Sequence, residues 1–119
     1  MAERLLVMVT RGPEDGDRAT VALVMAQSAL ALNKSVVVLL TLEGVRLGVP
    51  AVARAIQEPG LPRFLDLWEG ILQDGGAVWA CTPCVEKRGL RDALDPRIRP
   101  VGAVAAVEFL MDGGTSLSF

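Results

Sequence analysis

The sequence has no histidine and no tyrosine, and aromatic residues of any kind are few. Without histidine, the chain lacks the usual general base, the most common metal ligand and the Ser–His and Cys–His catalytic arrangements. Two tryptophans and three phenylalanines are too few to predict an aromatic platform on which nucleic-acid bases would stack. The sequence therefore predicts neither a metal site nor a stacking surface for nucleic acid.

Strong charge and long apolar runs are also missing. The formal net charge is −2, and a nucleic-acid partner is not expected without clustered Lys and Arg. No apolar run approaches the ~18 residues of a membrane span, and residues 5–9 are too few for the core of a signal peptide. We therefore expect no membrane contact and a cytoplasmic location, where thiols stay reduced.

The chain is nevertheless rich in apolar residues. Of 119 residues, 51% are hydrophobic, and the mean hydropathy is +0.41. Small α/β domains have such compositions because parallel strands are buried on both faces, and subunit interfaces raise the apolar fraction further. The length suits one domain covering residues 1–119, and the composition favours an oligomer.

The hydrophobic pattern alternates between strands and helices. Short apolar runs predict buried strands at residues 4–10, 35–41 and 77–81, with shorter strands at 98–101 and 115–119. Longer periodic segments predict helices at residues 18–33, 63–76 and 103–114, and a further helix opening at residue 82. This order predicts a single α/β domain with an open, mostly parallel sheet, right-handed crossovers and helices on both faces.

Three of these segments carry finer predictions. Residues 18–33 are apolar almost all round, so we expect this helix to be buried on more than one side, in part by another subunit. Asp15 or Asp17 is placed to cap its start. Residues 63–76 form an amphipathic helix, with the apolar positions Phe64, Leu67, Trp68, Ile71 and Leu72. Residues 42–62 form an irregular connection with a helical turn around 51–57.

The only two cysteines, Cys81 and Cys84, lie three positions apart in VWACTPCVEKRG. Cys81 ends a predicted strand, where ligands and chemistry gather in parallel sheets. Thr82 is a candidate N-cap and Pro83 a candidate first residue of the helix that follows. A helix N-terminus and nearby cations such as Lys87 and Arg88 stabilise a thiolate. The sequence therefore marks Cys81 as the candidate reactive residue.

Four interpretations of the cysteines compete. They are a dithiol redox pair, half of a zinc site shared between subunits, buried structural residues, or one nucleophilic thiol with Cys84 assisting or idle. A thioredoxin domain does not fit, because it places most of its length after this motif, whereas Cys81 lies late in 119 residues. From the residues alone, the redox pair and the single nucleophile are not separated.

Two loops after the first strands supply further candidates. Residues 11–18 follow the first strand but lack the glycine-rich and Gly-Lys-Ser/Thr patterns that bind phosphate, so no cofactor is predicted. Gly12 lies in this loop. Glu43 and Gly44 follow the second strand, at the sheet edge that also carries Cys81. These three residues are candidates to line the site, but an exposed turn is the simpler explanation for them.

The whole chain resembles the DsrE/DsrF-like family, which includes sulfur-relay subunits of the TusD and DsrE type. The resemblance covers the opening strand and acidic loop, the Ala-rich helix, LTLEGV, CTPCVEKRG and the terminal LSF. Cys81 matches the family's active cysteine, and Lys87, Arg88 and Gly89 match its basic pair and glycine. Cys84 is a departure shared with a C-x-x-C branch labelled predicted peroxiredoxins.

The resemblance implies a flavodoxin-like three-layer fold and a homotrimer or homohexamer. It also implies that Cys81 accepts sulfane sulfur as a persulfide and passes it to a partner thiol, with donor and acceptor proteins or small thiols as partners. Cys81 and Cys84 are then the catalytic candidates, and Thr82, Lys87, Arg88 and Gly89 support the thiolate. The alternatives are a dithiol oxidoreductase or redox sensor that uses both cysteines, and a non-catalytic oligomeric binding module.

Overall fold

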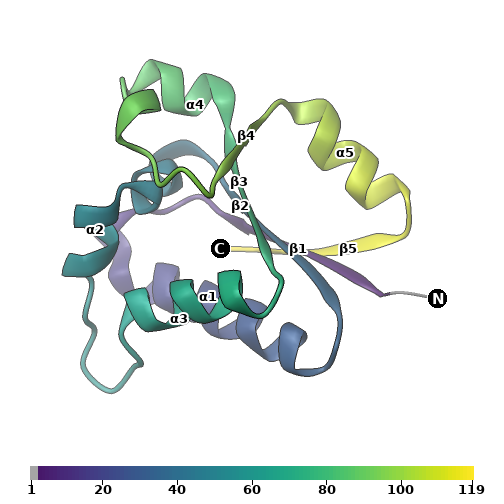
Figure 1. The fold of residues 1–119 in the computed structure, drawn as a ribbon, viewed down its shortest axis with the longest axis horizontal. Coiled ribbons are helices and arrows are strands. Elements are labelled where there is room, and N and C mark those ends of the chain that lie inside the picture. The colour runs from purple at the N-terminus through teal and green to yellow at the C-terminus, as the bar shows by residue number, and fades with distance from the viewer. Residues whose placement is uncertain (1–2) are drawn as a thin grey trace.

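A computed structural model describes residues 3–119, and its centre is a sheet of five parallel strands (Figure 1). The strand order is β4-β3-β2-β1-β5. In chain order the strands are β1 Arg4–Val9, β2 Ser35–Leu40, β3 Ala77–Cys81, β4 Arg99–Val101 and β5 Gly114–Ser118. All pairings are parallel, which confirms the α/β class and the parallel sheet predicted from the alternating pattern.

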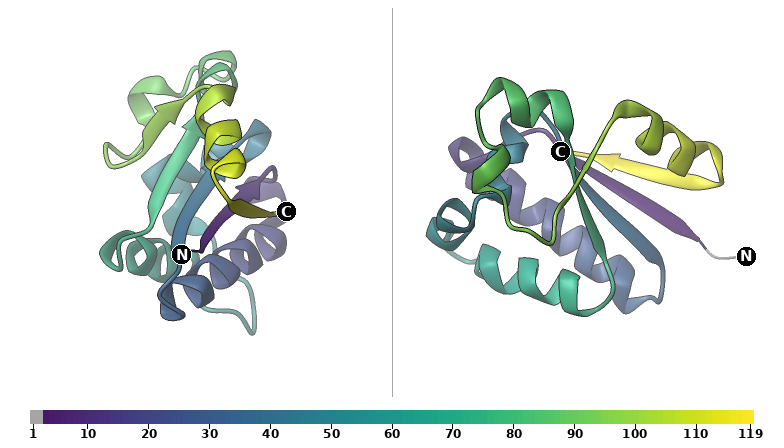
Figure 2. Two further views of the ribbon diagram at one scale, coloured as in Figure 1. Left: turned by 90° about the vertical axis from the view of Figure 1, so that its right-hand side faces the viewer. Right: turned by 45° about the horizontal axis from the view of Figure 1, so that its top comes forward.

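Five α-helices connect the strands and lie on both faces of the sheet (Figure 2). They are α1 Gly16–Ala31, α2 Pro50–Ala55, α3 Phe64–Gln73, α4 Thr82–Lys87 and α5 Ala103–Met111. Helices α1 and α3 pack side by side on one face, while α5 covers part of the other. The three-layer arrangement is therefore confirmed. Among residues 3–119, no helix is long and apolar enough to cross a bilayer.

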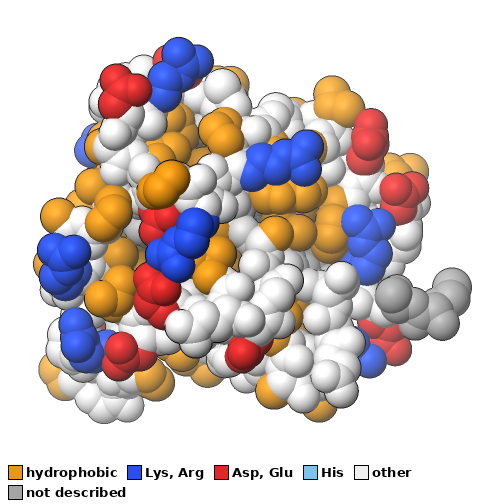
Figure 3. Space-filling view, in the orientation of Figure 1, with side chains coloured by type: hydrophobic (Ala, Val, Ile, Leu, Met, Phe, Trp, Pro, Cys, Tyr) orange, Lys and Arg blue, Asp and Glu red, His pale blue; other side chains and the backbone are white. Residues whose placement is uncertain are grey.

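The face under α5 has the smaller core. Its buried residues are Leu6, Val37, Leu39, Val101 and Phe109. Trp79 meets Phe109 edge to face, with ring centroids 6.0 Å apart. The side chains of Val104, Val107 and Met111 on α5 are exposed, Val107 beside a cavity under the helix, and hydrophobic side chains are visible at the surface around α5 (Figure 3).

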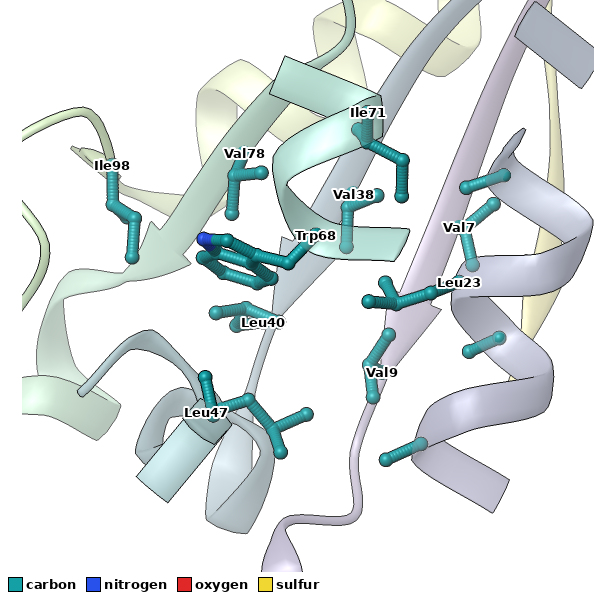
Figure 4. Close-up of a cluster of buried hydrophobic side chains, with 14 of the residues drawn as sticks. Val7, Val9, Leu23, Val38, Leu40, Leu47, Trp68, Ile71, Val78 and Ile98 are labelled. Carbon is teal, nitrogen blue, oxygen red and sulfur yellow. The ribbon is translucent and has the colours of Figure 1, made fainter. Parts of the chain in front are cut away.

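The opposite face carries the main core, beneath α1 and α3 (Figure 4). Trp68 and Ile71 of α3 lie over Val38 and Val78 of the sheet. Trp68 also stacks on Phe64 at a centroid distance of 5.9 Å. The predicted amphipathic stripe is thus correct at its fully buried positions, and Leu67 and Leu72 are partly buried against the same cluster.

Within one chain, helix α1 packs against both the sheet and α3. It is buried along one face, through Ala19, Ala22, Leu23 and Ala26, while Met25 on the other side is 44% exposed. Small alanines allow a close approach to the sheet, and burial of the remaining apolar side by another subunit stays a prediction. The helix starts where Asp15 accepts a hydrogen bond from the backbone N–H of Arg18 at 3.2 Å, so Asp15 is the cap.

The predicted irregular connection after β2 is more ordered than expected. It contains a 3₁₀ segment, Leu42–Gly48, followed by α2, which begins with Pro50 in its first turn. Proline suits this position because the first helical N–H groups have no partner inside the helix. The 3₁₀ segment matters for the site, since it lies directly above the carboxyl end of β2 and contacts α4.

Candidate functional site

The two cysteines lie together at the carboxyl edge of the sheet. Cys81 is the last residue of β3, and Cys84 lies in the first turn of α4. Their sulfur atoms are 2.8 Å apart, within hydrogen-bond distance of each other. Both residues are free and partly buried. The predicted strand-end position of Cys81 is therefore confirmed.

A backbone N–H group also reaches the sulfur pair. Leu42, the first residue of the 3₁₀ segment, donates from its N–H to Cys84 Sγ at 3.2 Å. Its φ angle is +52°, a left-handed conformation that is uncommon for residues other than glycine. Strained backbone of this kind persists only where the surrounding structure holds it. The result is a hydrogen-bonded row from Leu42 through Cys84 to Cys81.

The two sulfur atoms face different parts of the protein. Cys84 packs against the main core under α1 and α3. Cys81 instead lines a cavity of about 310 Å³ between the sheet and α5. Thr41, at the end of β2, and Met8, near the end of β1, line the same cavity. Three strand ends therefore meet around the Cys81 side of the pair.

Burial raises the pKa of the Cys81 thiol, and the Cys84 side chain raises this pKa further. The backbone N–H of Cys84 and the charge of Arg88 lower it, but their influence is smaller. The net direction is opposite to the stabilised thiolate expected from the sequence, because desolvation disfavours the charged form. In the free protein the Cys81 thiol is thus held mainly protonated at neutral pH.

Arg88 connects α4 to the 3₁₀ segment. Its Nε donates to Glu43 Oε1 at 2.8 Å, and its Nη1 donates to the carbonyl oxygen of Cys84 at 3.1 Å. Glu43 also accepts from Arg46 Nε at 2.6 Å. Hydrogen bonds from Arg46 and Arg88 lower the pKa of Glu43. Glu43 and Arg88 therefore hold the segment that carries the Leu42 N–H beside the cysteines.

The other residues predicted to support the thiolate contribute to the structure of α4 and its surroundings. Thr82 does not cap α4: Cys81 occupies the N-cap position, and the Thr82 hydroxyl donates to the Val101 carbonyl at 3.1 Å. The hydroxyl therefore ties the start of α4 to β4. Pro83 is the second residue of α4 rather than the first, and Lys87 is exposed near its end.

Gly89 ends α4 in a left-handed conformation, with φ of +64°. The N–H of Gly89 donates to the carbonyl of Glu86, and the N–H of Leu90 donates to that of Val85. This is the Schellman arrangement, in which glycine is favoured because it has no Cβ. Gly89 therefore shapes the helix end and is not placed at the sulfur atoms.

Gly12 and Gly44 allow close backbone contact behind the site. A Cβ on Gly44 would lie 2.1 Å from the carbonyl oxygen of Val9, and one on Gly12 would lie 2.4 Å from the carbonyl oxygen of Glu43. Both distances are far inside van der Waals contact, so neither position has room for a side chain. These glycines bring the loops after β1 and β2 together and thereby position Glu43.

Sequence reasoning missed Leu42 and the residues of α5 that face Cys81. The position of Thr41 at the end of a strand beside β3 is a sequence feature that could have identified it as a site residue. Nothing in the sequence indicates the left-handed conformation of Leu42. In the part of the chain that the structure describes, no group of three or more His, Cys, Asp or Glu side chains could hold a metal ion.

Comparison with known proteins decides the family. The model of the DsrE/DsrF-like family matches residues 3–119. The chain belongs to the DsrE/DsrF-like family. It is 34% identical over 89 residues to the uncharacterized protein MK0008 of Methanopyrus kandleri, covering 74% of this chain and 69% of that protein.

Two further relatives come from Methanocaldococcus jannaschii. The uncharacterized protein MJ0989 is 32% identical over 90 residues, covering 75% of each chain. The uncharacterized protein MJ0760 is 25% identical over 109 residues, which are 91% of this chain but only 40% of the relative. The present chain thus spans less than half the length of MJ0760.

Solved structures of similar fold agree with this assignment. The YchN protein of Escherichia coli superposes with a TM-score of 0.70 at 17% identity, and both chains are covered completely. The protein MTH1491 of Methanobacterium thermoautotrophicum gives a TM-score of 0.76 at 14% identity, again over the full length of both chains. At these identities the likeness shows that the DsrE-like fold is shared.

Proposed function

We propose that this DsrE-like protein is a sulfur carrier in which Cys81 accepts sulfane sulfur as a persulfide and passes it to a partner thiol. The observation that carries the proposal is the Cys81 thiol itself, at the carboxyl end of β3, with one side open to a cavity and the other against Cys84 Sγ at 2.8 Å. Membership of the family adds weight.

The reaction needs no outside oxidant. The Cys81 thiolate attacks the outer sulfur of a donor R–S–SH, the donor S–S bond breaks, and R–S⁻ leaves and takes up the proton that Cys81 gave up. A partner thiolate then attacks the outer sulfur of Cys81–S–SH and releases Cys81. Each step exchanges one S–S bond for another. Partial burial of Cys81 limits the access of water and of stray thiols to the persulfide.

The experiment is intact-protein mass spectrometry after exposure to a persulfide donor, with and without reductant. The proteins compared are wild type, Cys81→Ser and Cys84→Ser. The proposal predicts one added sulfur atom that reductant removes and that requires Cys81 but not Cys84. Sulfur uptake by Cys81→Ser equal to that of wild type would overturn it. No mass change in any protein would leave a binding module with unreactive thiols.

A dithiol oxidoreductase is the second candidate, and the sulfur–sulfur distance favours it. Sulfur atoms 2.8 Å apart need only a small movement to reach the ~2.05 Å of a disulfide. In that case the same mass spectra would show the loss of two hydrogens after a mild oxidant, and this loss would require both cysteines. Either role suits a cytoplasmic location, where thiols are kept reduced.

The proposal includes self-association as a trimer or hexamer. The exposed apolar side chains Val104 and Met111 of α5 support it, because a spacing of seven residues places them on one side of the helix. Light scattering at micromolar concentration tests this part. We expect wild type to be an oligomer and the double variant Val104→Glu, Met111→Glu to dissociate. A monomeric wild type would contradict the proposed self-association.

A further inference from the structure

The cavity beside Cys81 has a largely apolar wall. It occupies about 310 Å³ between the sheet and α5, within the size range of small-molecule sites. The sheet contributes Met8, Leu39 and Val101, and α5 contributes Ala106 and Leu110. Cys81 is one of the residues that form this wall, so a molecule that fills the cavity lies against Cys81.

No charged side chain is found among the described residues that line this cavity. The polar side chains there are the Thr41 hydroxyl and the Cys81 thiol. An anionic group would lose its hydration on entering without gaining a partner, which is unfavourable. The wall therefore selects against donors whose organic part carries carboxylate or sulfonate groups, and in favour of aliphatic ones.

We propose that this cavity binds the apolar organic group of an aliphatic persulfide, R–S–SH, and so places its outer sulfur at Cys81. The inference rests on the proposed sulfur-carrier function and names the substrate class. The bonds exchanged are those of the reaction above: the S–S bond of R–S–SH breaks, the Cys81 S–S bond forms, and R–SH is released with the proton from Cys81.

The size of the cavity sets the size of the group. A cavity of about 150 Å³ lined by apolar side chains holds benzene, so about 310 Å³ accommodates a chain of several carbons. Each buried CH₂ group strengthens binding about fourfold. The rate of reaction at Cys81 is therefore expected to rise about fourfold with each CH₂ until the cavity is filled, and then to level off.

Alkyl methanethiosulfonates test cavity binding without requiring sulfur-carrier activity. These reagents attach R–S to a thiol, so the rate at Cys81 is measured in Cys84→Ser for methyl, ethyl, propyl and butyl reagents and for the anionic sulfonatoethyl reagent. Each rate is divided by that of N-acetylcysteine. We expect a stepwise rise along the alkyl series and a sulfonatoethyl rate at least about tenfold below the ethyl rate.

Two variants fill the cavity, and one serves as a matched control. Ala106→Leu places bulk inside the cavity from α5, and Gly102→Leu does so where an added Cβ meets no atom within 4 Å. Val104→Leu enlarges an exposed side chain on the same helix outside the cavity. Both filling variants should abolish the dependence on chain length, and Val104→Leu should retain it. Two filling variants are used so that a folding defect in one does not remove the test.

The outcomes separate this inference from the proposed function. Rates independent of chain length, or equal for charged and alkyl reagents, would overturn the inference. A dependence seen only when an oligomer is diluted would also overturn it, because the occupant would then be a second copy. If alkyl persulfides load Cys81 at rates unrelated to R, the carrier function stands without the cavity. If the rate of Cys81 modification depends on the length of the alkyl chain but no persulfide forms on Cys81, cavity binding stands and the carrier function fails.

Discussion

Arg88 donates from Nε to Glu43 Oε1 at 2.8 Å, and this pair joins the helix that carries Cys84 to the segment whose Leu42 N–H reaches Cys84 Sγ. The Arg88 side chain is only 12% exposed, whereas Glu43 is 43% exposed. The pair is therefore partly desolvated on one side. The Glu43 carboxylate also compensates part of the Arg88 charge, and so weakens the effect of Arg88 on the pKa of the neighbouring Cys81 thiol.

Substitutions of the two partners should move the pKa of Cys81 in opposite directions. Arg88→Met removes a charge that lowers this pKa, so the Cys81 pKa should rise. Glu43→Gln leaves Arg88 charged but uncompensated, so the pKa should fall. The measurement is the pH dependence of Cys81 alkylation. Glu86→Gln, which alters an exposed pair with Arg91, is the charge-matched control, and shifts of one sign in both variants would contradict the prediction.

Removing the Cys84 side chain should lower the pKa of Cys81. Both the hydrogen bond and the charge of Cys84 raise this pKa in the wild type. A raised pKa means that thiolate reactivity appears only at higher pH, so Cys84→Ala should shift the alkylation profile of Cys81 to lower pH and increase the rate at pH 7. A profile that stays in place would show that Cys84 does not contribute to the raised pKa, and one that moves to higher pH would contradict the prediction.

Cys84 should also shorten the lifetime of a persulfide on Cys81. With sulfur atoms 2.8 Å apart, the Cys84 thiolate can attack the inner sulfur of Cys81–S–SH, forming the Cys81–Cys84 disulfide and releasing HS⁻. Proximity makes such intramolecular steps fast. Sulfide release measured after loading, with no acceptor thiol present, should be faster in wild type than in Cys84→Ser, while both proteins first take up the sulfur. Equal release from both proteins would assign Cys84 no part in this step.

The sequence was sufficient to predict the sheet because its strands are continuous apolar runs. Val36 to Leu40, for example, are all buried, as strands covered on both faces require. The position of Cys81 followed from the same pattern. The direction of its pKa did not, because desolvation depends on how α5 and the strand ends surround the thiol, and these contacts join residues distant in sequence.

The glycines near the site have structural uses that the sequence does not indicate. From the sequence, Gly12 and Gly44 are candidates to line the site, and the family motif implies that Gly89 supports the thiolate. The structure uses Gly12 and Gly44 for close backbone contact and Gly89 for a left-handed helix end. A single sequence does not distinguish these uses, since each of them requires a glycine at the position.

Gly44→Ala should destabilise the fold while Gly102→Ala should not. A methyl group on Gly44 would lie 2.1 Å from the carbonyl oxygen of Val9, whereas one on Gly102 meets nothing within 4 Å. Because the obstacle at Gly44 is backbone, relief requires a backbone shift, which typically costs about 1–3 kcal/mol. Urea unfolding of both variants checks this. Equal stability of the two would contradict the close contact between the loops.

Arg97 should stabilise the fold in a pH-dependent way. Asp95 is 8% exposed and accepts hydrogen bonds from Arg97 Nε at 3.0 Å and Nη2 at 2.7 Å. Arg97 also holds Glu69 through two bonds, and the N–H of Asp95 donates to the Gly48 carbonyl at 2.8 Å. The cluster therefore joins the connection before β4 to α3 and to the 3₁₀ segment above β2.

Hydrogen bonds from Arg97 lower the pKa of Asp95. A lowered pKa contributes stability above the unfolded value of about 3.9, and this stability is lost as the pH falls through the folded value. Arg97→Gln leaves the Asp95 carboxylate buried without a cation and should cost about 1–3 kcal/mol at pH 7. At pH 3 the loss should be smaller, as measured by urea unfolding at both pH values. Arg91→Gln, which breaks an exposed pair, is the control. An equal loss at both pH values would show that Arg97 acts through packing rather than through the Asp95 charge.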